Sequence, residues 1–106
     1  MFIAINYINC EKNYRERFEL LMKSRKKAVD TMPGFRGMEV LKPTNIDYEY
    51  LIISRWDDEK FFISWQHSAQ FTEGHRRGFE DISKAKKEGN RQPMLSTFKT
   101  YEILTR

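Results

Sequence analysis

Residues 2–9 (FIAINYIN) alternate with a period of two and are rich in β-branched and aromatic side chains, which predicts a β-strand. The odd face, with Ile3, Ile5 and Tyr7, is wholly apolar, so we expect it to cover the core. The even face is nearly as apolar, except at Asn6. A carboxamide on such a face needs a hydrogen-bond partner, and Asn6 is therefore a candidate functional residue.

Similar periodicities predict the next elements of the chain. Apolar side chains recur every three or four residues over 12–31, which indicates an amphipathic helix. The run MPGFRG stops this helix, because a proline disfavours helix at the residue before it and glycines permit a turn. Strands are expected at about 36–42 and 48–56, joined as a hairpin by the turn-rich KPTNID.

A second helical region is expected between residues 58 and 85. Asp57 is a good N-cap for its start, and Ser68 offers a second cap, so we expect a break or bend within the region. Residues 84–96 are polar and contain glycine and proline, which is typical of a mobile loop. A fourth strand, TFKTYEIL, ends the pattern.

The order β-α-β-β-α-β is that of the ferredoxin-like α+β fold, in which one antiparallel sheet carries both helices on one face. A chain of 106 residues has room for one core, so we expect a single domain over 1–106. The other face of the sheet would be bare and rich in Phe, Ile and Tyr, and such a face needs a partner. We therefore expect a homodimer formed face to face.

Charge and cysteine content narrow the possible partners and compartments. The 19 Lys and Arg against 15 Asp and Glu give a formal charge of +4, and the basic residues lie mostly on expected helix surfaces. This favours a solvated helix face over a groove for nucleic acid, although a small anionic ligand would be bound equally well.

Cys10 is the only cysteine, which fits a reducing compartment. The N-terminal MFIAINYI is too short for a signal peptide or membrane span, so we predict a soluble, cytoplasmic protein with no membrane partner.

The stretch FTEGHRRGF, residues 71–79, places a histidine in an apolar stripe. The stripe consists of Phe71, His75, Phe79 and Ile82. Gly74 and Gly78 lie on a neighbouring stripe, and each costs a helix roughly 1 kcal/mol relative to alanine. A flat, wide ligand against the helix would explain both features, because missing side chains allow close approach. The alternative is a histidine satisfied within the core and glycines that ease packing on the sheet.

Other site chemistries are poorly supported. His67 and His75 are eight residues apart without a His-Glu pattern, which does not make a zinc site. There is no phosphate-binding glycine loop after a strand, no GxSxG and no Cys-His pairing. A single axial imidazole to a haem iron needs only one histidine. Of the two tryptophans, we assign Trp56 to the core.

Three stretches together resemble a known family: MPGFRGMEVL, RWDDEKFFISWQHSAQF and the GH pair at 74–75, with an early asparagine in the first strand. Over essentially its whole length the chain is similar to the antibiotic-biosynthesis-monooxygenase superfamily of dimeric α+β barrels. Within it, Asn6, Trp65 and His75 match the trio of the IsdG-type haem-degrading monooxygenases. PGF-x-G marks only the superfamily, whereas the Asn, the Trp and the W-x(9)-H spacing together are more specific to the haem degraders.

The resemblance implies a role for each residue of the trio. His75 would be the axial ligand of haem iron, and its other ring nitrogen would be held by an acceptor that the sequence does not identify. Asn6 would hydrogen-bond dioxygen on the distal side, and Trp65 would press on the porphyrin and bend it. Haem would be cofactor and substrate at once, opened with dioxygen and electrons from an unidentified reductase or small reductant, with release of iron.

The resemblance extends to the surroundings of the porphyrin. Positions expected to line it are Phe71, Gly74 and Phe79. Counter-charges for the propionates are expected, by helix position, from Lys26, Arg25 and Arg76. The loop at 84–96 would order over the ligand as a lid. The acidic, glycine-containing segment 72–74 departs from the family pattern.

Two other functions are compatible with the same residues. The first is a cofactor-free oxygenase of the superfamily, in which Asn6 and Trp65 would polarise a polycyclic phenol or quinol. The second is a haem-binding carrier, sensor or stress protein without catalysis.

Overall fold

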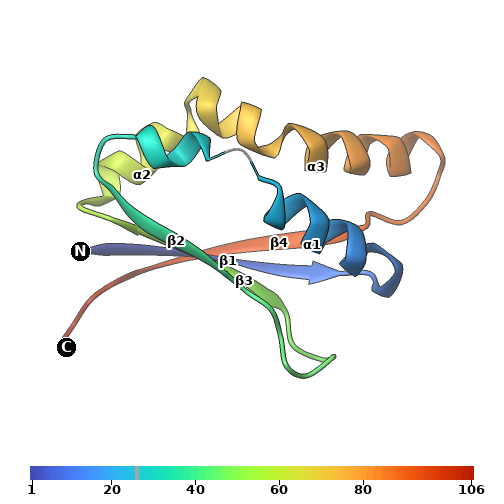
Figure 1. Cartoon of the computed structure of the whole chain (residues 1–106), viewed down its shortest axis with the longest axis horizontal. Helices are drawn as coiled ribbons and strands as arrows, with labels where there is room; N and C mark the ends of the chain where they lie inside the picture. The colour runs from blue at the N-terminus through green and yellow to red at the C-terminus, as the bar shows by residue number, and fades with distance from the viewer. Residues whose placement is uncertain (26) are drawn as a thin grey trace.

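The computed structural model describes residues 1–25 and 27–106, and it has the predicted ferredoxin-like α+β architecture. Its elements are β1 (Phe2–Cys10), η1 (Lys12–Tyr14), α1 (Arg15–Lys23), η2 (Ala28–Thr31), β2 (Phe35–Leu41), β3 (Tyr50–Trp56), α2 (Glu59–Gln66), α3 (Ala69–Lys87) and β4 (Met94–Glu102). The four strands form one antiparallel sheet in the order β2-β3-β1-β4, and the helices lie on one face of it (Figure 1). No helix of the described residues is long and apolar enough to cross a membrane.

The covered face of β1 is the even one, opposite to the expectation. Phe2, Ala4, Asn6 and Ile8 are buried, whereas the odd residues Ile3, Ile5 and Tyr7 are only partly covered. Alternation tells which residues share a face but not which face the helices will cover, and here both faces are apolar. The odd face is therefore the bare one within this chain.

Two hydrophobic clusters lie between the sheet and the helices. One is centred on Trp56, which is fully buried as predicted, and contains Phe2, Ala4, Val29, Phe62 and Trp65. The other contains Ile8, Cys10, Tyr14, Phe18, Leu21 and Tyr50. On the covered face of β1, Asn6 lies between Ala4 of the first cluster and Ile8 of the second.

The first helix is shorter than the predicted 12–31. A 3-10 turn precedes α1, and α1 ends at Lys23, where Ser24 donates from its hydroxyl to the Leu20 carbonyl at 2.6 Å. The cause is packing: Phe18 and Leu21 belong to the second cluster, whereas Val29, on η2, belongs to the first. The spacing of apolar residues is helical across both segments, so it does not reveal that Leu21 and Val29 belong to different elements and pack in different clusters.

The second helical region is broken as predicted, but one cap differs. Ser68 starts α3 and accepts a hydrogen bond from the Phe71 amide at 3.1 Å. The N-cap of α2 is Asp58, not Asp57, because the Asp57 carboxylate is engaged by Arg36 in two hydrogen bonds of 2.6 and 2.8 Å. The polar loop predicted at 84–96 is shorter, since α3 continues to Lys87 and β4 begins at Met94.

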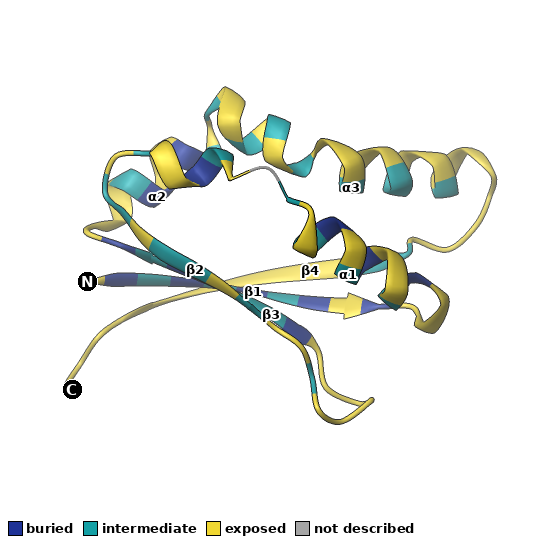
Figure 2. Ribbon diagram, viewed as in Figure 1, coloured by how far each residue is buried: buried dark blue, intermediate teal, exposed yellow. Residues whose placement is uncertain are grey.

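Helix α3 is held in place without a single fully buried residue (Figure 2). Part of its attachment is polar: the Arg77 guanidinium donates to the Ser24 hydroxyl at 3.0 Å and to the carbonyls of Ser24 at 3.0 Å and Leu21 at 3.3 Å. Tyr14 and Arg17 donate to the Asp81 carboxylate at 2.6 and 3.0 Å. These contacts tie α3 to α1 and its preceding turn, while the rest of the helix stays half-open to solvent.

Candidate functional site

His75 lies on α3 with one ring nitrogen already engaged. Its Nδ1 is 2.7 Å from the Phe71 carbonyl oxygen one turn earlier. A carbonyl only accepts, so Nδ1 carries the proton and donates it. The neutral ring therefore keeps its free lone pair on Nε2, which is the state of a histidine that ligates a metal.

The surroundings of His75 keep this ring neutral. Burial lowers the pKa of His75 below its usual 6.5, and the hydrogen bond to the Phe71 carbonyl, which favours the charged ring, offsets only part of this. An imidazole available as a ligand near neutral pH follows from this environment.

Aromatic rings flank His75 on both sides along the helix. Phe71 stacks on the imidazole with ring centres 4.1 Å apart, and Phe79 lies 5.5 Å away at an interplanar angle of 19°. Trp65, from α2, is 5.8 Å from the imidazole and 4.8 Å from Phe71. The break at residues 67–68 is what brings Trp65 beside a histidine on the next helix.

Asn6 projects from the covered face of β1, opposite Ile52 of β3 and Phe98 of β4 in the sheet. The side chain is buried, at 7% exposure, among apolar neighbours. Phe98 reaches back to the first cluster, with its ring 5.9 Å from Phe62. Asn6 and the Trp65–His75 pair thus share the layer between sheet and helices.

Two buried polar atoms in this layer lack hydrogen-bond partners. Among the described residues, Asn6 Oδ1 and Trp65 Nε1 are sealed from solvent and unpaired, and the third such atom, Arg15 Nε, lies elsewhere. An unsatisfied buried polar group costs about 1–3 kcal/mol, so each is expected to have a purpose. One unpaired acceptor and one unpaired donor therefore lie in the same layer as His75.

The two helix glycines serve different purposes. A Cβ at Gly74 would meet no atom within 4 Å, so this side of the helix is open. A Cβ at Gly78 would lie 3.4 Å from the Met94 methyl of β4, so this glycine lets α3 approach the sheet. A role for Gly74 beside a ligand therefore stays a prediction, whereas Gly78 serves packing.

The basic residues predicted to pair with the haem propionates differ in exposure and in their present partners. Arg76 is exposed and pairs with Glu73 on its own helix. Arg25 is mostly covered and lies 3.9 Å from Asp30. Lys26 lies outside the described residues. The remaining basic side chain nearby, Arg77, was not singled out in the sequence, and it binds the end of α1 instead.

The Phe71 carbonyl is the main element that the sequence did not identify. Position 71 precedes 75 by one helical turn, and a histidine can reach back to that carbonyl only in a suitable rotamer. The spacing was visible, but the rotamer depends on the packing of Trp65 and Phe79 around the ring.

The family follows from a match over most of the chain. The model of the family described as antibiotic biosynthesis monooxygenase matches residues 1–77, which include Asn6, Trp65 and His75. This chain belongs to the antibiotic biosynthesis monooxygenase family. A heme-degrading monooxygenase of Bacillus cereus (strain B4264) is 44% identical over 62 residues, 57% of this chain and 53% of that protein. The chain thus spans about half the length of such curated relatives.

Solved structures of other proteins share the whole architecture of this chain. MhuD, a heme-degrader from Mycobacterium tuberculosis with two hemes bound in its active site, has a TM-score of 0.71 at 19% identity, covering 100% of this chain and 98% of that one. SnoaB, a cofactor-independent oxygenase from Streptomyces nogalater, has a TM-score of 0.67 at 16% identity, covering 99% and 94%. At these identities the likeness is one of fold, and one fold here serves two kinds of oxygenase.

Proposed function

We propose that this chain is a haem-degrading monooxygenase, which holds haem through His75 and opens the porphyrin ring with dioxygen and external electrons, releasing iron. The observation that carries the proposal is the neutral imidazole of His75, fixed at Nδ1 by the Phe71 carbonyl, with Nε2 left for a ligand. The similarity to a Bacillus cereus protein named for this activity supports it over half of the chain.

Haem, when bound, supplies the iron at which dioxygen is activated and the ring that is oxidised. His75 would hold the iron through Nε2, while the Phe71 carbonyl keeps the ring in one tautomer and orientation. The Asn6 carboxamide has N–H donors and an acceptor oxygen, and would orient dioxygen by a hydrogen bond. Trp65 would lay its indole against the porphyrin, and Phe71, Phe79 and the open side of Gly74 would complete the apolar surround.

For the propionates, we propose Arg25, Arg76 and Lys26 as counter-charges. Arg76 would have to exchange its partner Glu73 for a propionate, and Arg25 would do the same with Asp30. At 3.9 Å, the Arg25–Asp30 pair is loose, so the exchange costs little.

Titration of the purified protein with haem tests the binding step. We expect a saturable Soret shift in the wild type that is lost in His75→Ala. His67→Ala is the matched control, since His67 is the other histidine and is exposed at the end of α2, and it should bind like the wild type. Absence of a Soret shift in the wild type would refute haem binding and favour the cofactor-free oxygenase.

Addition of ascorbate in air tests the chemistry. Turnover bleaches the Soret band, and free iron then appears when a ferrous chelator is present. A stable spectrum would instead mean that the protein stores or senses haem.

We also propose that the protein acts as a homodimer paired through the bare face of the sheet. This face carries Ile3, Ile5, Leu51 and Ile53, all partly exposed, together with Tyr101 at 45% and Leu95 at 59% exposure. The same face also carries the Arg55–Glu39 ion pair and Lys99. Its partly exposed aliphatic and aromatic side chains are expected to be covered by a partner. We propose as well that residues 1–106 form a single domain and that the protein is cytoplasmic. The electrons would come from a reductase or a small-molecule reductant.

A further inference from the structure

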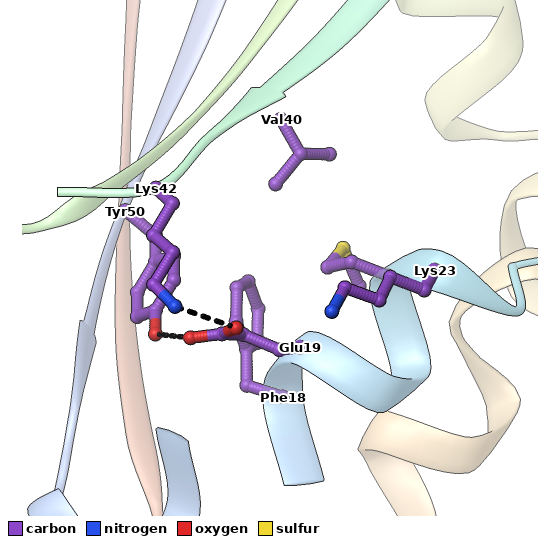
Figure 3. A pocket seen from close by; sticks show the side chains of 7 residues that line it. Phe18, Glu19, Lys23, Val40, Lys42 and Tyr50 are labelled. Carbon is purple, nitrogen blue, oxygen red and sulfur yellow. Dashed lines mark hydrogen bonds and ion pairs between the residues drawn. The ribbon is translucent and has the colours of Figure 1, made fainter. Parts of the chain in front are cut away.

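A cavity lies between α1 and the β2–β3 hairpin, lined by none of the residues assigned to haem above. Its volume is about 180 Å³, and it is lined by Phe18, Glu19, Met22, Lys23, Val40, Lys42 and Tyr50 (Figure 3). Ligand pockets for drug-sized molecules are about 300–1,000 Å³, so an occupant here must be smaller, with one ring or a short chain.

The walls of this cavity are apolar and well fixed. Phe18 is 1% exposed and Tyr50 is 2% exposed, and their rings pack at 4.7 Å. Val40 and Met22 pack against the same cluster from the hairpin and the helix. Rigid apolar walls favour the body of an apolar ligand, because little must be reorganised when it enters.

The carboxylate in the cavity is already satisfied. Glu19 accepts a hydrogen bond from the Tyr50 hydroxyl at 2.5 Å and another from Lys42 Nζ at 3.1 Å. The dashed lines in Figure 3 show both bonds converging on this one group. Glu19 and Lys42 therefore neutralise each other, and a cationic ligand would find no free carboxylate.

Lys23 supplies the remaining charge. Figure 3 shows its side chain extending from α1 into the cavity, with the amino group on the Glu19 side and away from Val40. In the part of the chain that the structure describes, Lys23 forms no hydrogen bond or close ion pair, although its charge, after the bonds from Tyr50 and Lys42, also helps to lower the pKa of Glu19. Lys23, Lys42 and Glu19 together give the cavity a net charge of one positive unit. An ammonium group over apolar walls is complementary to an anion with an apolar body.

We propose that this cavity binds a small monocarboxylate with an apolar body, an aromatic or short aliphatic acid, whose carboxylate pairs with Lys23. The ring or chain lies on Phe18, Val40 and Tyr50, and Glu19 keeps Lys42 oriented at the rim. This inference is independent of the proposed haem chemistry, since none of the lining residues has a role in it.

Benzoate is a suitable probe, with the Met22 methyl group as the reporter. Titration of benzoate into methionine-methyl-labelled protein should shift the Met22 signal in a saturable way and leave the Met38 signal unchanged. Met22→Leu assigns the signal. Lys23→Gln should weaken benzoate binding roughly two- to fivefold, the effect of one exposed ion pair, and benzamide should bind more weakly by a similar factor.

Lys86→Gln, a charge change on the exposed face of α3, is the control and should leave the affinity unchanged. The proposal is overturned if the Met22 signal does not approach saturation by about 10 mM benzoate, roughly ten times the dissociation constant of a weak site of about 1 mM. It is overturned equally if Lys23→Gln binds like the wild type, or if benzamide binds as well as benzoate.

Discussion

The Nδ1 atom of His75 lies 2.7 Å from the carbonyl oxygen of Phe71 on the same helix. This one contact fixes the tautomer, the orientation of the ring and the position of the free nitrogen. It also explains how an imidazole on a helix without buried residues is held in one orientation. The proposed ligand atom, Nε2, is oriented by its own helix and by the rings stacked on the imidazole.

The low pKa of His75 makes the stability of the ligand-free protein depend on pH. Below the ordinary value of 6.5 the unfolded chain takes up a proton that the folded protein resists, so the free energy of unfolding falls as the pH falls. Urea unfolding at pH 7.5 and 5.0 should therefore show a loss in the wild type that is smaller in His75→Phe. His67→Phe should keep the wild-type loss, and an equal loss in all three proteins would contradict the assignment.

Replacement of Asn6 should separate stability from activity. Asn6→Val removes a buried carboxamide whose oxygen has no partner, so we expect the free energy of unfolding to rise by about 1 kcal/mol. Haem affinity should stay within about threefold, because Asn6 is not the iron ligand, while ring opening is lost. Chemical denaturation and the ascorbate assay measure the two effects.

Ser54 provides the contrast for Asn6 on the same face of the sheet. It is equally buried, but its hydroxyl accepts a hydrogen bond from Trp56 Nε1 at 3.0 Å. Ser54→Val leaves that donor unpaired and should lower the free energy of unfolding by about 1–3 kcal/mol. If Asn6→Val is destabilising to the same extent, the Asn6 carboxamide has a structural role instead.

The sequence predicted the order of the elements and the break before α3, because both depend on local signals such as periodicity and the Ser68 cap. It did not predict the covered face of β1, since both faces are apolar and the choice depends on where the helices pack. The N-cap at Asp58 was missed for a related reason, because the distant Arg36 occupies Asp57.

The candidate site shows the same division between local and tertiary information. The apolar stripe of His75 was visible in the sequence, and Asn6 stood out as a polar residue on an apolar face. The unpaired state of Asn6 Oδ1 and Trp65 Nε1 and the bond to the Phe71 carbonyl needed the tertiary structure. Spacing groups Gly78 with Gly74, yet a side chain at Gly78 would meet Met94 of β4.

Gly34, in the turn before β2, should tolerate no side chain. Its φ of +74° is in the left-handed region, and a Cβ would lie 2.3 Å from the Phe61 ring. Gly37 also has a positive φ, of +127°, but a Cβ there would meet nothing within 4 Å. Both alanine variants should be destabilised by backbone strain, and Gly34→Ala by about 1–3 kcal/mol more because of the steric clash. Equal losses in thermal unfolding would show that the clash relaxes without cost.

Arg77 should control how firmly α3 is held. Arg77→Ala removes the hydrogen bonds to Ser24 and Leu21, so we expect a loss of about 1–2 kcal/mol and faster amide exchange along α3. Arg76→Ala removes a neighbouring arginine that pairs only with Glu73 on its own helix, so it should change stability by less than about 0.5 kcal/mol. If α3 exchanges equally in both variants, the helix is held by its apolar contacts alone.

The bare sheet face can be tested with a single charge. Ile5 lies in the middle of β1 and is paired with Ile53 of β3 on the odd face, so Ile5→Lys would place an unpaired ammonium group in the proposed interface. Ile63→Lys is the control, because Ile63 is 45% exposed on α2, in the helical layer. Sedimentation should show a dimer for the wild type and Ile63→Lys, and a folded monomer for Ile5→Lys. A dimer that persists in Ile5→Lys would mean that the subunits meet elsewhere, because a lysine buried between two sheets without a partner costs several kcal/mol.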